Sequence, residues 1–452
     1  MQTTVQILLA ASTDNHGFSL DEFVLTLHTL MEERGLAGVA SLVLNLIEER
    51  LCLDLCQQTP NTWRPESGCC PTPRYELAQR RGRTFRTRVG TLAIPWRTLR
   101  CTRCGKTLIP LRDFLGLAPY QRKTSELEQL VVEIVSEQSY RRATSHLDKI
   151  GLIPVPKSTA HRWVAESDCD AIDTGVDTMD FLFSDGSGYK RRPDKAAGLN
   201  NRGEVRVAFG IDSKGNLRPL GAWSDESWAS IAQQVQGRRR EDQPVAETFL
   251  GDGEPGMVEA MGTLCDFVQR CHWHAGRDLN YAMWKNDAPL AERKTETKEL
   301  AGILGISLPK EDVELVSPDD KMDLEDAVQQ AEERVEMLCR RLLRKGYVDA
   351  WTYVRRMKHS LFEYVRRWLA TGLVSPRAAS LIERLMREIA RRLKRLAHGW
   401  SPKGAAKMAC IILKRFRDAT SWDTYWKKKL RLDGKVIWLL QKIESAPTLL
   451  GR

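Results

Sequence analysis

The stretch ETFLGDGEPGMVEAMGTLCDFVQRCHWHAGRDL, residues 247–279, decides the fold. The run Glu247–Leu250 is typical of a short buried strand, Met257–Leu264 has the pattern of a helix, and Phe267–Trp273 is a second apolar segment. We therefore expect a strand, a turn, a helix and another strand, with Asp252 at the carboxyl end of the first strand. Ligands bind at this edge of an open α/β sheet, so Asp252 is a candidate metal ligand.

A second aspartate, Asp185, closes the apolar segment Met179–Ser184 and is followed by Gly186, Ser187 and Gly188. Two carboxylates at strand ends of one sheet can hold a divalent cation, and a third acid would complete a two-metal site for phosphoryl chemistry. Each aspartate taken alone is also compatible with an ordinary turn residue, because Asp and Gly are frequent in loops.

The chain of 452 residues carries 69 Lys and Arg against 59 Asp and Glu, which gives a net charge of +10. The basic residues gather in Arg80–Arg83, Arg238–Arg240 and Arg384–Arg395, as in proteins that neutralise a nucleic-acid backbone. A solvated surface face is the alternative for any one cluster. With 42% hydrophobic residues, no long apolar run and no leading signal segment, we expect a globular protein without a membrane span.

Four of the eleven cysteines suggest a zinc site. Cys101 and Cys104 have the spacing of a knuckle that places two thiolates on one metal ion. Cys69 and Cys70 lie about thirty residues upstream and would supply the second pair, although adjacent cysteines depart from the usual two-residue gap. Disulfides are not expected in the absence of a secretory context.

The segment between the two cysteine pairs, Arg83–Arg100, reads as a β-hairpin with basic edges, so the pattern favours a zinc ribbon. Cys52 and Cys56 are possible substitutes as ligands. Reduced, buried cysteines without metal are the remaining alternative.

Residues 124–168 have the pattern of a helix-turn-helix. Helices are expected over Ser125–Ser136 and Ser139–Leu147, and a third begins at Ser158, which is a suitable N-cap. The polar face of this third helix, with His161 and Arg162, suits a DNA major groove. Three short helices also pack together for structural reasons alone.

The α/β core is expected between residues 178 and 274. After the Asp185 strand come strands at Glu204–Ile211 and Leu217–Trp223 and a helix over Asp225–Gln236. Three strands, a helix, the Asp252 strand, a helix and a final strand make the order of a ribonuclease H-like sheet. Residues 276–374 are almost wholly helical in pattern and form an all-α insertion, in which Met322–Lys345 is one long helix.

A basic amphipathic helix is expected over Ser375–His398, with an apolar stripe that includes Leu381, Leu385 and Ile389. Glu383 lies outside this stripe on the polar side. It could reach the two aspartates only if that side turns towards the sheet edge. A surface salt bridge to Arg387 at i+4 is the alternative.

The segments GDGEPGM around Asp252, Cys271-His272-Trp273-His274, and the late helix with Ile382-Glu383-Arg384 together resemble the Mutator-like transposases and the related bacterial insertion-sequence transposases. The likeness covers about residues 178–415. It implies a ribonuclease H-like fold with a DDE triad, a Cys-x-x-His signature after the second aspartate, and a helical insertion before the glutamate.

Carried over by position, the resemblance assigns the triad to Asp185, Asp252 and Glu383, which would bind two Mg²⁺ or Mn²⁺ ions. The Cys-x-x-His pair, Cys271 and His274, would support the site by packing and hydrogen bonding. The family often has Asn shortly before the glutamate, where this chain has Ala379 and Ser380. The rivals are Glu388 and Glu363 for the third acid and Asp180 for the first.

The resemblance implies a DNA transposase that cleaves at element ends and joins the freed 3′-hydroxyl to target DNA, with Arg384, Arg387 and Arg391 along the DNA path. It also implies a homo-oligomer on double-stranded DNA in the cytoplasm of a prokaryote, associated with the nucleoid. A non-catalytic, domesticated DNA-binding regulator and a metal-dependent nuclease without joining activity are the alternatives.

The expected regions are a helical lead-in (1–50), a zinc-ribbon-like module (51–115), a helix-turn-helix region (116–170), the first part of the core (171–275), the all-α insertion (276–374) and the glutamate helix with a helical C-terminal region (375–452).

Overall fold

The computed structural model describes residues 19–31, 35–66, 68–150, 153–170, 172, 178–193, 198, 200–237, 243–395, 399–417 and 419–431. The basic cluster Arg238–Arg240 therefore lies outside the described residues. The chain divides into two compact units, considered separately below. Unit 1 comprises residues 1–135, 140–164 and 423–452, and unit 2 comprises residues 136–139 and 165–422.

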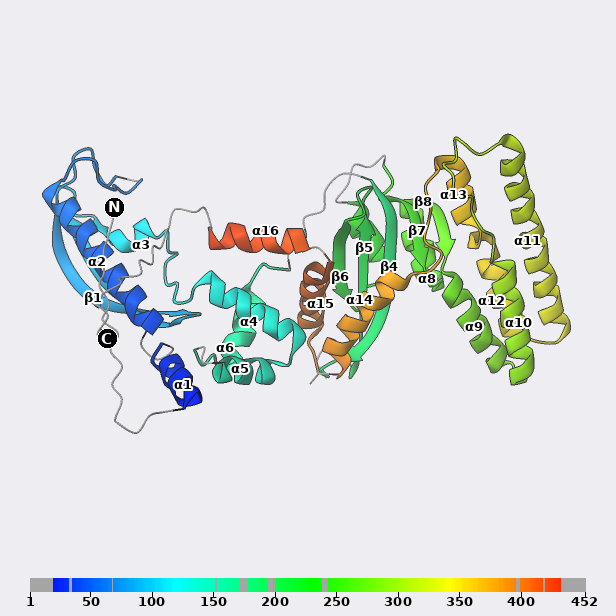
Figure 1. The fold of residues 1–452 in the computed structure, drawn as a ribbon, viewed down its shortest axis with the longest axis horizontal. Coiled ribbons are helices and arrows are strands. Elements are labelled where there is room, and N and C mark those ends of the chain that lie inside the picture. The colour runs from blue at the N-terminus through cyan, green and yellow to red at the C-terminus, as the bar shows by residue number, and fades with distance from the viewer. Residues whose placement is uncertain are drawn as a thin grey trace, which may run out of the picture. The chain divides into compact units, whose positions relative to one another are not determined.

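Unit 1 contains a small antiparallel sheet with the order β1-β2-β3 (Figure 1). Its first two strands make the hairpin expected from the sequence, and alternate residues Leu92, Ile94 and Trp96 are buried. Helix α2 covers the sheet, and its buried Glu48 accepts a hydrogen bond from the Arg97 backbone N–H at 2.6 Å. The elements are α1 (Leu20–Leu30), α2 (Leu36–Gln57), β1 (Tyr75–Thr87), β2 (Gly90–Cys101), β3 (Thr107–Leu108) and α3 (Pro110–Phe114).

Three helices follow where the helix-turn-helix is expected: α4 (Ser125–Glu137), α5 (Tyr140–Lys149) and α6 (Lys157–Glu166). Each buries an apolar side, for example Ala160 and Val164 on α6. The expected N-cap is wrong, because α6 begins at Lys157 and Ser158 lies inside its first turn.

Unit 2 contains a five-stranded mixed sheet with the order β6-β5-β4-β7-β8. The first three strands along the chain pair antiparallel with one another, β7 pairs in parallel with β4, and β8 pairs in parallel with β7. The chain is thus mixed α/β with a second, small antiparallel sheet. The strands are β4 (Met179–Lys190), β5 (Arg202–Ile211), β6 (Leu217–Ser224), β7 (Ala246–Gly251) and β8 (Cys265–Arg270).

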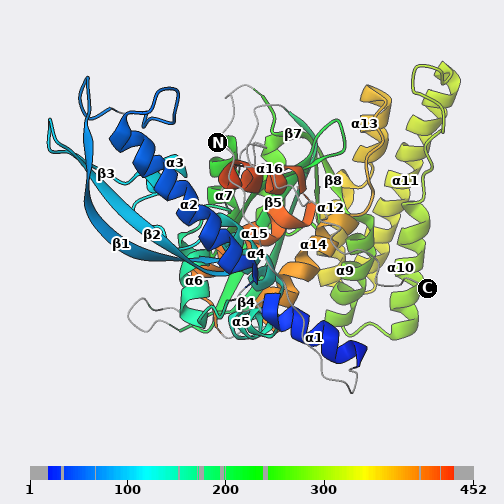
Figure 2. The ribbon, with the colours of Figure 1, turned by 60° about the vertical axis from the view of Figure 1, so that its left-hand side comes forward.

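Helices cover both faces of this sheet (Figures 1 and 2). Alternation along β4 directs Leu182 into the core with α7 (Trp228–Gln236) and α8 (Pro255–Met261). Phe183 points to the other face, where α14 (Ser380–Ala390) packs on β4 and α15 (Pro402–Arg417) packs on β5 and β6. Helix α14 continues as a short π-helical turn, Arg391–Arg395, and α16 spans Ala419–Leu430.

The expected helical insertion lies between β8 and α14 and has its own core, which includes Leu300, Val335 and Leu338. Its elements are α9 (His272–Lys285), α10 (Leu290–Ile303), α11 (Pro318–Arg344), α12 (Val348–Met357), the 3-10 turn Lys358–Ser360 and α13 (Glu363–Thr371). Helix α11 starts at Pro318 because the Ser317 hydroxyl caps it and proline fits a first helical turn. Within the described part of the chain, no helix is both long and apolar enough to cross a membrane.

Several expected boundaries are wrong, for identifiable reasons. Asp185 does not end its strand, because β4 continues to Lys190 by pairing with β5. Trp273 belongs to α9 rather than to a strand, since β8 ends at Arg270, level with the last residue of β7. The helix expected from Asp225 begins after the Ser227 N-cap, and the helix expected from Ser375 begins at Ser380.

Candidate functional site

The register of β4 and β7 brings Asp185 and Asp252 to the same edge of the unit 2 sheet. Phe183 lies beside Leu250 in the parallel pair, so the residues two positions further along each strand come level with one another. Those residues are Asp185, inside β4, and Asp252, just beyond the end of β7. The two aspartates therefore meet although only one of them ends a strand.

A tight turn holds Asp252 in place. Its Oδ1 accepts a hydrogen bond of 3.0 Å from the Glu254 backbone N–H, and Gly253 has a φ of +84°. The buried Arg270 guanidinium, at the end of β8, occupies the space where a Cβ on Gly253 would stand. Only glycine suits this position, for conformational and steric reasons together.

The start of helix α9 fixes the helix that carries Glu383. The His272 backbone N–H donates to the Arg377 carbonyl at 2.8 Å, and Cys271 Sγ accepts from the backbone N–H of Ala379, the residue before α14. His274 Nε2 then lies 2.9 Å from Glu383 Oε1. Cys271 thus fixes the start of α14, and His274 fixes the carboxylate of Glu383. Glu383 therefore pairs with His274 rather than with Arg387.

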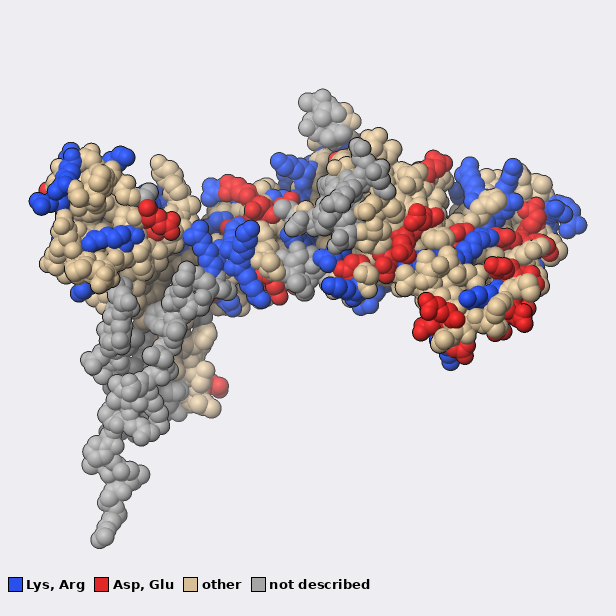
Figure 3. Space-filling model, turned by 90° about the horizontal axis from the view of Figure 1, so that it is seen from above, with Lys and Arg blue, Asp and Glu red and all other residues tan. Residues whose placement is uncertain are grey.

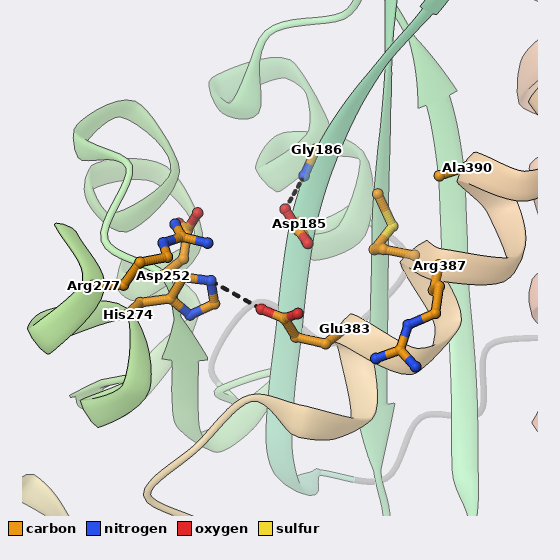
Figure 4. A pocket seen from close by; sticks show the side chains of 9 residues that line it. Asp185, Gly186, Asp252, His274, Arg277, Glu383, Arg387 and Ala390 are labelled. Carbon is orange, nitrogen blue, oxygen red and sulfur yellow. Dashed lines mark hydrogen bonds and ion pairs between the residues drawn. The ribbon is translucent and has the colours of Figure 1, made fainter. Parts of the chain in front are cut away.

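One pocket of about 410 Å³ collects all three acids (Figure 4). Arg277 from α9 and Arg387 from α14 flank the carboxylates, and Met386 supplies an apolar part of the wall. The rival acids lie outside the pocket: Glu363 pairs with Arg366, Glu388 pairs with Arg391, and Asp180 is the second residue of β4. The lining residues are Asp185, Gly186, Asp252, His274, Arg277, Glu383, Met386, Arg387 and Ala390.

The electrostatics of the pocket reflect crowded carboxylates. Burial, and next the negative charge of Asp252, raise the pKa of Asp185 from 3.8 to about 7, although the Gly186 backbone N–H donates to Asp185 Oδ1 at 2.6 Å. Burial, and next the charge of Arg277, lower the pKa of His274, so this imidazole is neutral near pH 7. The neutral imidazole donates from Nε2 to Glu383 Oε1, and its buried Nδ1 has no partner in the described structure.

The three carboxylates offer the oxygen ligands that divalent ions prefer. They lie too far apart, however, to surround a single ion. Oxygen ligands suit Mg²⁺ and Mn²⁺. The oxygens of the three carboxylates are not all within 4.8 Å of one another. Among the described residues, only a group of cysteines has its ligand atoms that close together. A pair of ions about 3.5–4 Å apart spans a wider set of ligands than one ion does. Asp185, Asp252 and Glu383 could therefore hold two ions.

The four expected cysteines of unit 1 form a compact group. The Sγ atoms of Cys69, Cys70, Cys101 and Cys104 all lie within 4.8 Å of one another and could bind a structural metal such as zinc. The distances from Cys70 Sγ to Cys69 Sγ and to Cys101 Sγ are 3.9 and 3.8 Å. A tetrahedral site with Zn–S bonds of about 2.3 Å requires a sulfur separation of roughly 3.8 Å.

The backbone around these thiols stabilises charge on one of them. Backbone N–H groups, led by that of Cys104, lower the pKa of Cys101 to about 6, whereas burial raises the pKa of Cys70 to about 12. Only part of the group ionises without a cation. The possible substitutes are not in the group, because Cys52 is buried beside Leu55 and Leu99 and Cys56 is exposed.

The residues expected to contact DNA have different surroundings. His161 and Arg162 are exposed on α6, and His161 packs its ring 5.3 Å from that of Tyr140. Arg384 and Arg387 are exposed on α14, whereas Arg391 is bound to Glu388 and to the Glu137 carbonyl. Acidic and basic side chains lie side by side over the helical insertion (Figure 3), so it presents no uniformly basic surface in this view.

Sequence reasoning missed Arg277, Met386 and the pairing of Arg270 with Gly253. Arg277 could have been found, because it lies three residues after His274 and so on the same side of one helix. Arg270 could not, because its role depends on the packing of β8 against the turn after β7. No protein-family model and no curated protein matches this chain.

Proposed function

We propose that this protein is a DNA transposase of an insertion sequence, which cleaves DNA at element ends and joins the freed 3′-hydroxyl to target DNA in a metal-dependent reaction. The observation that carries the proposal is the meeting of Asp185, Asp252 and Glu383, from three separate elements, in one pocket flanked by two arginines. Binding alone has no use for three carboxylates that repel one another.

The finer fold assignment within this proposal is a ribonuclease H-like core. Three consecutive antiparallel strands followed by two parallel ones, in the order β6-β5-β4-β7-β8, support it. The helical insertion between β8 and α14 also stands where the resemblance to Mutator-like transposases implies it, ahead of Glu383.

Asp185, Asp252 and Glu383 would hold two Mg²⁺ or Mn²⁺ ions. When bound, such ions lower the pKa of a water or a 3′-hydroxyl and stabilise the oxygen that leaves phosphorus. Asp185 must give up its proton before it can act as a ligand, because it is half protonated near pH 7.

The other pocket residues would position groups. His274 donates a hydrogen bond to Glu383 and so orients its carboxylate. Arg277 and Arg387 reach the pocket rim from opposite sides and are suited to bind the phosphate groups of a DNA strand (Figure 4). The π-helical turn after α14 continues this surface with Arg391, Lys394 and Arg395.

Unit 1 would recognise the element ends. The four-cysteine group would hold zinc and fix the long hairpin, whose edges carry Arg80, Arg81 and Arg83. Helix α6 would offer His161 and Arg162 to the major groove. Two ends must be held together for joining, so we expect a homo-oligomer on double-stranded DNA.

The test is a cleavage and joining assay with Mg²⁺ or Mn²⁺, using DNA that flanks the gene as the source of candidate ends. We expect Asp252→Asn and Glu383→Gln to abolish both steps while end binding persists, because removing a charged ligand spares the DNA contacts. Glu388→Gln is the matched control on the same helix, outside the pocket, and should keep activity.

Unchanged transposition by Asp252→Asn would refute this site. Cleavage without any joined product would favour a nuclease. End binding by a wild-type chain that never cleaves in either metal would favour a regulator.

A further inference from the structure

Helix α9 carries a row of exposed aromatic side chains that begins beside the pocket. Trp273, Tyr281 and Trp284 are 55%, 59% and 59% exposed. With Arg277 and Asn280 they occupy one side of the helix, because at about 100° per residue the five positions fall within roughly 100° of its circumference. We call these five residues the α9 stripe.

The α9 stripe has no role in the core of the insertion. The opposite side of α9 supplies that core through Ala275, Leu279 and Met283, all of which are fully buried. Single exposed apolar residues are ordinary on protein surfaces, but a contiguous row of large ones marks a binding surface. The row contains two Trp and one Tyr, which bury much area at little cost in side-chain entropy.

The α9 stripe is continuous with the pocket. Arg277 lines the pocket, and its guanidinium lies 5.0 Å from the centre of the Trp273 ring. Trp273 in turn meets the His274 ring edge to face at 4.8 Å. The α9 stripe therefore begins at the pocket wall and continues along α9 away from the carboxylates.

The charge of the α9 stripe suits an anionic chain. Among its five residues, all of them described, the only charged side chain is Arg277, and Lys285 follows at its far end. Asp278 lies to one side of the row and accepts hydrogen bonds from Arg277 Nε and Arg270 Nη2. Flat rings alternating with a cation and an amide are the elements of a surface that stacks bases and follows a backbone.

We infer that the α9 stripe binds unpaired nucleotides of a DNA strand, by stacking bases on Trp273, Tyr281 and Trp284, as the strand leaves the pocket. The inference rests on the proposed function and adds to it that the substrate is locally single-stranded at the site. The stripe runs from Trp273 to Trp284, and the helical rise between these two residues is about 16 Å, which corresponds to roughly four or five nucleotides of one strand. A protein partner would not explain why the row begins at a pocket lined by two arginines and three acids.

The test measures binding of three labelled DNA probes to the full chain by fluorescence anisotropy in EDTA, so that no cleavage occurs. The probes are a sixteen-nucleotide oligo(dT), an abasic oligonucleotide of the same length, and a blunt duplex of the same length. The abasic probe keeps the phosphates and lacks the rings. We expect wild type to bind oligo(dT) more tightly than the abasic probe.

Trp284→Ala should weaken oligo(dT) binding by about tenfold, within the range known for base stacking, and should leave abasic and duplex binding unchanged. Trp284→Phe should restore most of the loss. Met337→Ala on α11 is the matched control, because Met337 is 55% exposed and lies off the row. Circular dichroism and thermal melting verify that each variant is folded.

Equal affinity of wild type and Trp284→Ala for oligo(dT) would overturn the inference. So would an equal loss for all three probes, which would mean that the change acts on charge or folding. Both results leave the cleavage assay with Asp252→Asn unaffected. A failure of the α9 stripe is therefore distinguishable from a failure of the proposed function.

Discussion

The cysteine group of unit 1 and the carboxylate pocket of unit 2 are two candidate metal sites of opposite construction. The four thiols lie within 4.8 Å of one another and come from residues 69–104, on either side of a single hairpin. The three carboxylates lie farther apart, line an open pocket and come from residues 185–383. A closed site of local origin suits a structural ion, whereas an open site built from distant elements suits a substrate.

The two sites also differ in how they limit repulsion between neighbouring negative charges. In unit 1, backbone N–H groups stabilise the Cys101 thiolate, whereas burial keeps the Cys70 thiol protonated. In unit 2, Asp185 stays protonated to about pH 7, and Glu383 is held by His274. Metal should therefore contribute much more to the stability of unit 1 than to that of unit 2, and the following changes test this difference in decreasing order of effect.

Cys101→Ser should have the largest effect. It removes one of four ligands, and the free energy of a structural zinc site is folding free energy, so we expect a loss of roughly 5 kcal/mol or more and release of zinc. Thermal melting and a zinc assay check this. Cys56→Ser, an exposed cysteine outside the group, should change neither, and the comparison breaks down if the two variants behave alike.

Gly253→Ala should destabilise unit 2 by about 3 kcal/mol, because it forces alanine to a φ of +84° and displaces the Arg270 guanidinium. It should also weaken Mn²⁺ binding, since Asp252 is the preceding residue. Gly256→Ala is the control, because a Cβ there meets no atom within 4 Å. Similar melting temperatures for the two variants would contradict the account of the turn.

Asp185→Asn should stabilise the metal-free chain at pH 8 by a few kcal/mol and have no effect below about pH 4. The folded carboxyl has its pKa raised to about 7, so the native state binds more protons than the unfolded state between about pH 4 and 7. The free energy of unfolding of wild type therefore falls as pH rises through this window, and asparagine does not titrate.

Saturating Mn²⁺ should reverse that order at pH 8, because only wild type offers the carboxylate. Melting curves of wild type and Asp185→Asn are recorded at pH 8 and at about pH 4, each with and without Mn²⁺. The difference in stability between the two proteins is then compared across these four conditions. A variant that is less stable than wild type at pH 8 without metal would show that Asp185 is not under electrostatic strain.

Cys271→Ala should have the smallest effect on stability, about 1–2 kcal/mol, by leaving the Ala379 backbone N–H without its acceptor. Its specific effect should be a severalfold lower Mn²⁺ affinity, because the start of the Glu383 helix loosens. Cys339→Ala removes an equally buried thiol from the core of the insertion and should leave Mn²⁺ affinity unchanged.

The sequence predicted the local elements better than their ends. Segments of β-type residues bounded by turn residues indicated the Arg83–Arg100 hairpin and the strands of unit 2, and the helical pattern of residues 276–374 indicated the insertion. It did not show that β4 passes Asp185 to reach Lys190, because that extension depends on pairing with β5, a contact between segments distant along the chain. The start of α9 was misread for the same reason.

The site itself was predicted from residue types and from resemblance, and its geometry was not. Helical periodicity placed Glu383 outside the apolar stripe and favoured a salt bridge to Arg387. The tertiary contacts of Cys271 and His274 instead turn that side of α14 towards the aspartates. The boundaries of the expected regions, the metal occupancy and the DNA contacts stay predictions.

Iron-directed cleavage of the polypeptide tests the central claim most directly. Fe²⁺ replaces Mg²⁺ in the zinc-loaded chain, and ascorbate with peroxide generates hydroxyl radicals that cut the backbone beside the bound iron. The account predicts three cuts, near residues 185, 252 and 383, all suppressed by excess Mg²⁺ and all lost in Asp252→Asn. Cuts at only one of these positions, or a pattern that Asp252→Asn leaves unchanged, would contradict a shared metal site.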